Sequence, residues 1–390
     1  MKLELTTQQK ELRAELREYF AGLITPDERK AMLKQRHGQV YRDIVRRMGR
    51  DGRLGVGWPV EYGGRGFGEI EQHIFVDEAA RADVQLPSVT LQTVGPALQT
   101  FGSEEQKTRF LPRILAGDVH FAIGYTEPDA GTDLASLRTS AVRDGDEYVV
   151  NGQKIFTTGG HDADFVWLAV RTDPDAPKHR GISILIVDTT DPGYSWTPII
   201  TCDGAHHTNS TYYQDVRVPA NMLVGKENEG WKLITAQLNH ERVMLGPAGR
   251  IAGLYDRVRN WASAHKTPDG TPLLDLPDVR GALAETRATM RINELLNWQV
   301  AAAASGSPVD IADASATKVF GSERIQRISR LLEEVVARHG DPAEPGTAAL
   351  AEWLDVLAKR NLVLTFGGGV NEVQRELIAT AGLALPRVPR

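Results

Sequence analysis

The chain has 390 residues, of which 41% are hydrophobic and 25% charged. At ~150 residues per domain this length allows two or three domains, and the composition excludes a disordered or fibrous chain. The single cysteine, Cys202, excludes an intrachain disulfide framework and a cysteine-rich metal cluster, and it indicates a reducing compartment. The net charge of -6 gives no basic surplus for binding nucleic acid.

The first residues are predicted to fold as a helix and not to serve as a targeting signal. Leu12, Leu16 and Phe20 recur on one helical face, and Thr6 and Gln9 stand at the spacing of a capping box. No apolar stretch approaches the ~20 residues that span a bilayer. We therefore expect a cytoplasmic protein without a membrane segment.

Along the chain the period of the hydrophobic pattern changes twice. It is helical to about Asp118, typical of strands from about His120 to Val224, and helical again from Trp231. The expected strands are rich in β-branched and aromatic residues, and the pairs Asp144-Gly145 and Asn151-Gly152 are expected to form turns between them. The domains are predicted at residues 1–118 (α), 119–225 (β) and 226–390 (α). The expected strands include residues 147–150, 165–170, 182–187 and 211–213.

This order argues against a Rossmann enzyme, in which strands and helices alternate throughout. The triplet Gly367–Gly369 lacks the G-x-G-x-x-G spacing and follows a helical stretch. We interpret it as a break between two helices, the second of which begins near Asn371.

Two strings in the β segment carry the most specific signal: Tyr125-Thr126-Glu127-Pro128-Asp129-Ala130-Gly131-Thr132-Asp133 and Asn151-Gly152-Gln153-Lys154-Ile155-Phe156-Thr157-Thr158-Gly159-Gly160. Either one alone could be an ordinary turn. Together they resemble the flavin cradle of the acyl-CoA dehydrogenase family. The resemblance extends over nearly the whole chain, through Trp58-Pro59-x-Glu61-Tyr62-Gly63-Gly64, residues 101–107, Val218-Pro219 with Gly225 and Glu227, and residues 371–375.

The resemblance implies an α+β fold with an N-terminal α-helical domain, a middle β-barrel or sandwich and a C-terminal four-helix bundle. It implies an FAD-dependent enzyme that desaturates an acyl-CoA thioester at its α,β bond. The sequence is most similar to actinobacterial members that act on cholesterol side-chain CoA thioesters as heteromers, so a steroid substrate is included in the prediction.

Carried over residue by residue, the resemblance assigns seven positions to the flavin. Thr158 would donate its hydroxyl to flavin N5, where the hydride arrives, and Phe156 would lie against the isoalloxazine, at a place where the family often has Trp. Gly131 and Thr132 would meet the pyrophosphate. One side of the flavin would be lined by Ile123, Tyr125 and Thr126.

A base must also remove the proton next to the thioester carbonyl. Many family members place a Glu in a C-terminal Tyr-Glu-Gly-Thr segment, where this chain has Gly368. Other members keep a catalytic Glu at the position of Glu241, which becomes the candidate general base, with Arg242 beside it as a substrate-binding residue.

The residues around Glu241 support this assignment independently. Trp231, Ile234, Leu238 and Leu245 define an apolar stripe, and Glu241 lies on it, three residues after Leu238. A carboxylate on an inward face should have a raised pKa, which suits a general base at neutral pH. The alternative is a buried ion pair with Arg242 or Arg250.

Two motifs by which homotetrameric members contact a neighbour's flavin are missing. Residues 264–270 lack the Arg-x-x-x-Phe-Gly pattern, and residues 334–342 lack Gln-x-x-Gly-Gly. We therefore predict a hetero-oligomer, a heterotetramer, in which a second related chain supplies these contacts. The resemblance also implies an acyl-CoA substrate and an electron-transfer protein as acceptor.

Two other functions stay open at this point. Loss of the C-terminal Glu is compatible with a non-catalytic companion subunit, and a flavin oxidase or monooxygenase could share the fold. No metal site is expected, because His206 and His207 are adjacent and no further His or acid recurs at a ligand spacing.

Overall fold

The computed structural model describes residues 4–244, 246–304 and 310–386, and the side chains of residues 238–244 and 304 lie outside that description. The chain forms two compact units. One consists of Met1–Thr25, Phe67–Gln85 and Arg242–Arg390, and the other of Pro26–Gly66 and Leu86–Glu241. Secondary structure changes from helix to strand between Ala116 and Phe121, and back between Val224 and Gly230. This order confirms the predicted fold class, while the three domain boundaries stay a prediction.

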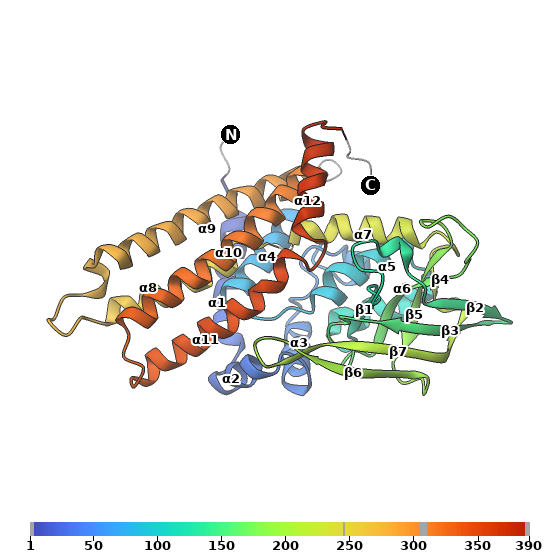
Figure 1. Ribbon diagram of the computed structural model, residues 1–390, viewed down its shortest axis with the longest axis horizontal. Coiled ribbons are helices and arrows are strands. Elements are labelled where there is room, and N and C mark those ends of the chain that lie inside the picture. Colours follow the sequence, from blue (N-terminus) through green and yellow to red (C-terminus); the bar gives the residue numbers. More distant parts are fainter. Residues whose placement is uncertain (1–3, 245, 305–309, 387–390) are drawn as a thin grey trace. The chain divides into compact units, whose positions relative to one another are not determined.

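The first unit is a bundle of helices from both ends of the chain. Thr6 and Gln9 form the predicted capping box at the start of α1. Helix α1 packs on α4 through Arg17, whose guanidinium donates to the buried carboxylate of Glu78 at 2.6 and 2.9 Å. The long helices α8 to α11 run side by side (Figure 1). The helices of this unit are α1 (Thr7–Leu23), α4 (Glu69–Arg81), α8 (Gly249–Ala264), α9 (Pro277–Ala304), α10 (Ile311–His339), α11 (Pro345–Asn361) and α12 (Asn371–Leu377), with short turns η5 (Leu273–Asp275), η6 (Leu362–Thr365) and η7 (Ile378–Gly382).

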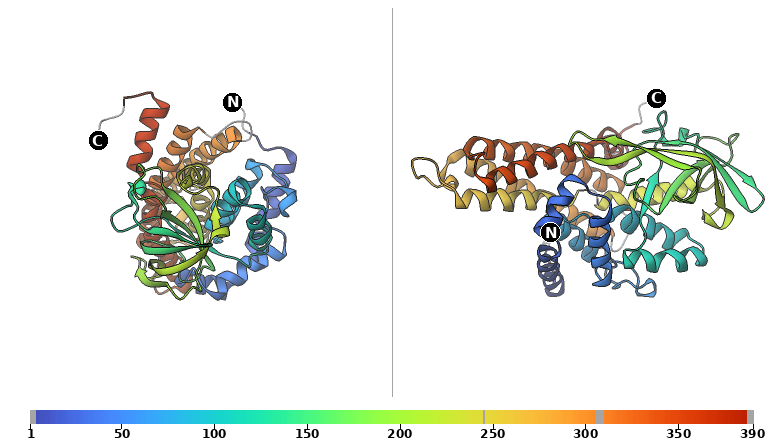
Figure 2. Two further views of the ribbon diagram at one scale, coloured as in Figure 1. Left: turned by 90° about the vertical axis from the view of Figure 1, so that its right-hand side faces the viewer. Right: turned by 90° about the horizontal axis from the view of Figure 1, so that it is seen from below.

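The second unit contains an eight-stranded sheet in the order β6-β7-β3-β2-β4-β5-β8, with β1 pairing in parallel with β4. Figure 2 shows the twist of this sheet. Strands β4 and β5 are buried on both faces, which explains their unbroken apolar sequences. The strands are β1 (Phe121–Gly124), β2 (Ser140–Asp144), β3 (Glu147–Lys154), β4 (Phe165–Arg171), β5 (Ile182–Asp188), β6 (Tyr194–Ile200), β7 (His206–Pro219) and β8 (Leu223–Val224).

Helices and short turns complete the second unit. Ser103 and Gln106 form a capping box at the start of α6, as their spacing suggests. Helix α7 begins in this unit and runs into the first. The bounds are α2 (Pro26–Lys34), α3 (Gln39–Arg50), α5 (Gly95–Phe101), α6 (Glu104–Ala116) and α7 (Gly230–Met244), with η1 (Val60–Tyr62), η2 (Val89–Val94), η3 (Leu134–Ser136) and η4 (Ala220–Met222).

One expected turn is wrong. Asn151-Gly152 does not end a strand but lies inside β3, where the register with β7 shifts between Val150 and Gly152. A Cβ on Gly152 would lie 2.6 Å from Thr139 Oγ1, so the glycine allows a close approach within the sheet. Asp144-Gly145, in contrast, does stand at the turn between β2 and β3.

Candidate active site

The two strings singled out in the sequence, residues 125–133 and 151–160, meet where strands β1 and β3 end. The first follows β1 directly, and the second runs from the end of β3 into a turn. The N–H of Ile155 donates to the carbonyl of Thr126 at 2.8 Å, so the backbones of the two segments are joined. Their union comes from hydrogen bonds between segments about 30 residues apart, which a linear pattern does not report.

A buried ion pair locks these segments together. Lys154 is 0% exposed, and its Nζ donates to Glu127 Oε1 at 2.8 Å and to the carbonyl of Tyr125 at 3.1 Å. The carboxylate of Glu127 also accepts the N–H of Arg138 at 2.7 Å and that of Thr139 at 2.8 Å. Every charge in the pair is thus neutralised or hydrogen-bonded, as a buried pair requires.

Burial and pairing act in opposite directions on these two groups. Burial lowers the pKa of Lys154 to about 8, against the attraction of Glu127. Burial by itself would raise the pKa of Glu127, but Lys154 and the N–H donors outweigh it and hold that pKa below its usual value. Both groups are therefore charged at neutral pH.

The predicted flavin-facing residues fall into an exposed and a buried group. Phe156 is 60% exposed at φ +60°, and Thr158, Gly131 and Thr132 are exposed as well. The remaining three, Ile123, Thr126 and Tyr125, are half-buried, half-buried and buried respectively.

Tyr125 directs its side chain into the unit. Its hydroxyl lies 2.5 Å from Gln237 Oε1 and accepts from Trp167 Nε1 at 3.1 Å. Tyr125 therefore connects the loop to helix α7 and to the core of the sheet.

The exposed residues suit a flat, polar-edged cofactor such as FAD. The aromatic side chain of Phe156 is exposed, and Thr158, two residues later, is exposed as well. A Cβ added to Gly131 would meet only Thr126 Cγ2, at 3.7 Å, so the backbone there is open to a close approach. The surface thus offers a ring to pack on, hydroxyl donors and accessible backbone N–H groups.

Sequence reasoning missed three residues that hold this surface: Glu127, Lys154 and Asn209. Glu127 and Lys154 lie within the two segments, but their sequence positions alone do not reveal that they form an ion pair. Asn209 shares the inward phase of β7 with Thr211 and Tyr213, all of them buried. A polar amide on the inward side of a strand needs hydrogen-bond partners, and this is the feature of the sequence that could have pointed to Asn209.

The candidate base lies in helix α7, but the side chains of Glu241 and Arg242 are outside the described residues. Helix α7 buries Leu233, Ile234 and Gln237. At the alternative base position, Gly368 has φ +68°, a conformation that a Glu rarely adopts.

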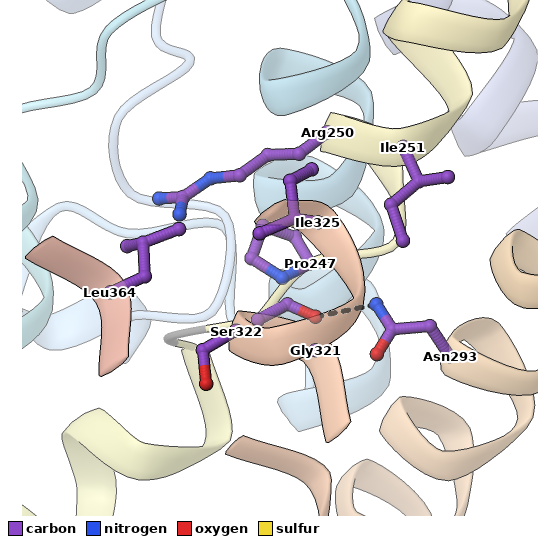
Figure 3. Close-up of a pocket in the computed structure, with 9 residues that line it drawn as sticks. Pro247, Arg250, Ile251, Asn293, Gly321, Ser322, Ile325 and Leu364 are labelled. Atoms are coloured by element: carbon purple, nitrogen blue, oxygen red, sulfur yellow. Dashed lines mark hydrogen bonds between the residues drawn. The ribbon is translucent and has the colours of Figure 1, made fainter. Parts of the chain in front are cut away.

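A small pocket lies in the helical unit just after α7. Asn293 Nδ2 donates to the carbonyl of Gly246 at 2.9 Å (Figure 3). Asn297 Nδ2 donates to the same carbonyl at 2.8 Å, so the two amides anchor the chain there. The pocket includes none of the residues predicted for flavin. It is lined by Gly246, Pro247, Arg250, Ile251, Asn293, Gly321, Ser322, Ile325 and Leu364.

His206 and His207 contact different groups. His206 Nε2 lies 2.7 Å from Asn209 Oδ1, whereas His207 Nε2 lies 2.8 Å from Asp203 Oδ2. Among the described residues no three His, Cys, Asp or Glu side chains are arranged to hold a metal ion. Nor does any helix in the described part of the chain have the length and apolarity to cross a membrane.

Family models match the chain in three consecutive segments. Residues 6–118 match the N-terminal domain of acyl-CoA dehydrogenases, residues 122–216 the middle domain and residues 228–383 the C-terminal domain. The chain belongs to the acyl-CoA dehydrogenase family. It is accordingly an FAD-dependent oxidoreductase that acts on acyl-CoA thioesters.

Individual relatives align with this chain over their full length. The chain is 70% identical to the acyl-CoA dehydrogenase FadE29 of Mycobacterium tuberculosis and 50% identical to FadE26 of the same organism, each over 100% of both chains. Among solved structures it superimposes on one chain of the ChsE4–ChsE5 complex from Mycobacterium tuberculosis with a TM-score of 0.91 at 51% identity, and the match covers 100% of this chain and 100% of that chain. The steroid acyl-CoA dehydrogenase Tcur3481–Tcur3483 gives 0.92 at 49% identity, also over 100% of both chains.

Proposed function

We propose that Glu241 is the general base of this acyl-CoA dehydrogenase and that FAD binds on the surface formed by the two joined strings. The observation that carries the proposal is the Glu127–Lys154 pair, which fixes both strings while Phe156 and Thr158 stay exposed. Bound FAD would accept the hydride that leaves the acyl chain.

The residues of this chain would then bind and orient the cofactor. Phe156 would pack against the ring system, and the hydroxyl of Thr158 would donate a hydrogen bond to its reactive edge. Gly131 and Thr132 would offer backbone N–H groups to the pyrophosphate. Ile123, Tyr125 and Thr126 would border the remaining side, Tyr125 through its backbone, since its side chain is directed inward.

Two features favour Glu241 as the base over a C-terminal carboxylate. The position of Gly368 has no carboxylate, and its backbone conformation disfavours one. Helical spacing assigns position 241 to the same face of α7 as Ile234 and Gln237, which are 0% and 5% exposed. We propose that Arg242, the next residue in the chain, contacts the substrate.

The decisive experiment is anaerobic addition of an acyl-CoA substrate to the flavin-loaded Glu241→Gln variant. The variant should keep its FAD but fail to bleach it, or bleach it ~10²–10⁴-fold more slowly. Glu352→Gln is the matched control, because Glu352 is an exposed residue of α11. Bleaching at the unaltered rate in Glu241→Gln would remove Glu241 from the role.

We propose further that the acyl group is bulky, with a steroid side-chain CoA thioester as the expected substrate. The support is the similarity to a solved enzyme that is described as a steroid acyl-CoA dehydrogenase. The test compares kcat/KM across acyl-CoA thioesters of increasing size that end with a steroid thioester. A preference for short linear chains would contradict the proposal.

The chain is also proposed to act in a heterotetramer with a second related chain and to pass its electrons to an electron-transfer protein. Two similar solved structures are complexes of two named chains. In addition, residues 264–270 and 334–342 lack the motifs with which homotetrameric members contact a neighbour's flavin.

A further inference from the structure

Asn209 forms hydrogen bonds with both the backbone N–H and the backbone carbonyl of Thr157, the residue before Thr158. The Asn209 carbonyl accepts the N–H of Thr157 at 3.0 Å, and the Asn209 side-chain Nδ2 donates to the Thr157 carbonyl at 3.0 Å. The hydroxyls of Thr157 and Thr211 add a third contact at 3.0 Å. Thr157 is 0% exposed, so this clasp determines where the exposed Thr158 stands.

The clasp fixes the orientation of the amide and with it the protonation of two imidazoles. A carbonyl can only accept, so the atom 3.0 Å from the Thr157 oxygen must be the amide nitrogen. Its second hydrogen points to His161 Nδ1 at 3.0 Å, which must therefore present a lone pair. The amide oxygen lies 2.7 Å from His206 Nε2, which must carry the proton. His161 is thus neutral and protonated on Nε2.

The environment of His161 disfavours a second proton on the ring, at Nδ1, which would make the imidazole a cation. Its ring stacks on that of His206, with centroids 3.9 Å apart and an interplanar angle of 25°. Among the described residues Nε2 of His161 has no hydrogen-bond partner. The ring is edge-on to His37 with centroids 5.3 Å apart, and the ring of Trp196 is tilted against it with centroids 5.7 Å apart.

Charged and titratable groups surround the ring on each element packed against it. Among the described residues the acidic groups are Asp162, Asp164 and Asp203, and the cations are Arg36 and Arg42. The set is Arg36 and His37 before α3, Tyr41 and Arg42 in α3, Asp162 and Asp164 between His161 and β4, Asp203 before β7, and His206 and His207 in β7. Burial lowers the pKa of His161, and the neighbouring His206 lowers it further.

We propose that Asn209 and His161 are positioning residues for the flavin: neutral His161 keeps the Asn209 amide on Thr157, and this places Thr158 for the cofactor. The inference rests on the proposed FAD site. A proton on His161 Nδ1 would set one N–H against another, because Asn209 Nδ2 donates at that contact. The amide would have to turn, the Thr157 carbonyl would lose its donor, and the turn that carries Thr158 would loosen.

The direction of the pH dependence follows from the lowered pKa of His161. The ordinary imidazole value is 6.5, and a released turn would take up protons more readily than the ordered one. The flavin-binding conformation is therefore fully favoured above pH 6.5 and is lost as the pH falls below that value and through the lowered pKa.

The test uses the full chain, co-purified with its companion and loaded with FAD. The FAD dissociation constant and the flavin absorption spectrum are measured between about pH 5 and pH 8, the range of imidazole titration. The wild-type dissociation constant should rise about tenfold toward the acid end, which corresponds to ~1.4 kcal/mol, as expected for the loss of one buried hydrogen bond.

Two variants of His161 separate positioning from simple packing. His161→Asn places an amide oxygen where Nδ1 stands, so it should bind FAD as the wild type does at neutral pH without the acid-dependent rise. His161→Leu removes the acceptor and should bind about tenfold more weakly at every pH. His339→Asn, in the helical unit, is the matched control and should keep the wild-type pH profile.

The outcomes distinguish this inference from the proposed function. An unchanged acid-dependent rise in His161→Asn, or a pH-independent wild type, would overturn the inference while leaving the FAD site in place. If Phe156→Ala and Thr158→Ala leave FAD binding and the flavin spectrum unaltered, the proposed FAD surface itself fails.

Discussion

Lys154 shows how a single buried charge can organise a binding surface from below. It ends strand β3 just before one of the two joined loops, and its ammonium donates to the backbone carbonyl of Tyr125 and to the carboxylate of Glu127, both in the other loop. An apolar residue of similar length could fill its volume, but it would leave Glu127 buried without a cation. The pair therefore couples the stability of the unit to the geometry of its exposed residues.

Lys154→Met should destabilise the protein by about 3–5 kcal/mol, because it strands a buried carboxylate. Urea unfolding of the wild type and the variant measures the loss. Lys178→Met is the matched control: Lys178 pairs with Asp133 at 2.6 Å, but the two side chains are 62% and 59% exposed. That variant should cost less than about 1 kcal/mol. Equal losses in both variants would contradict the role of burial.

At this scale the sequence predicts features whose partners are near in the chain. The capping box predicted at Thr6 is confirmed, and Ser103 forms a second one, because each is a contact between residues three apart. Lys154 and Asn209 were missed because their roles depend on partners about 30 and 50 residues away. The assignments of Glu241, Arg242 and the flavin-facing residues came from resemblance, and they stay predictions.

Helices α4 and α8 pack with their backbones in close approach. A Cβ on Gly249 would lie 1.9 Å from the carbonyl oxygen of Asp77, and one on Gly253 would lie 2.6 Å from that of Arg81. The N–H of Gly249 also donates to the Asp77 carboxyl at 2.6 Å. The two glycines thus set the distance between the helices.

Gly249→Ala should destabilise the protein by about 1–3 kcal/mol, because a methyl group must push the helices apart. Gly281→Ala provides the comparison, since Gly281 is an exposed residue of α9 with nothing within 4 Å of the added Cβ. The second substitution should stabilise by up to ~1 kcal/mol through helix propensity. Thermal unfolding of both variants measures the difference, and equal shifts would refute the packing argument.

The contact at Asp77 should also make this helix pair sensitive to pH. Burial raises the pKa of Asp77 from 3.8 to about 7, so the folded protein holds a proton that the unfolded chain releases. Stability from this group is therefore present below pH 4 and is lost as the pH rises through about 7. Asp77→Asn keeps an acceptor for Gly249 and should flatten the dependence. Urea unfolding at several pH values compares it with the wild type, and parallel curves would contradict the assignment.

Helices were easier to predict than strands at the scale of elements. The apolar face of α1 and the buried runs of β4 and β5 were evident from their periods. Strand β6 was not expected, because it contains Pro198 and is exposed along most of its length at the edge of the sheet. Asn151-Gly152 was misassigned as a turn because the bulge that it forms depends on β7 and Thr139.

At the scale of the whole molecule, the missing neighbour-contact motifs bear on whether one chain can bind FAD tightly without a second chain. The surface that we propose for the flavin ring is built from the chain's own residues, whereas residues 264–270 and 334–342 lack the family patterns for contacting the rest of the cofactor. We therefore expect that this chain of 390 residues folds by itself but needs the proposed second chain for tight FAD binding.

Expression of this chain alone should yield protein with little bound FAD, and co-expression with its companion should restore about one FAD per complete site. Absorbance of the purified protein at the flavin band, divided by protein concentration, measures the ratio. Size measurement by light scattering identifies the assembly. A yellow, fully active homo-oligomer would overturn the proposal.

The helical unit joins α1 and α4 to helices that begin only after residue 242. During synthesis the chain leaves the ribosome from its N-terminus, so the sheet unit has its complete sequence while the partners of α1 and α4 are still being made. Phe20 and Phe75, buried against each other in the finished protein with ring centroids 5.5 Å apart, can meet early. The close backbone contact between α4 and α8 cannot form before Gly249 has been translated. Helix α4 is therefore translated early but completes its native contacts only after α8 and α9 have been made.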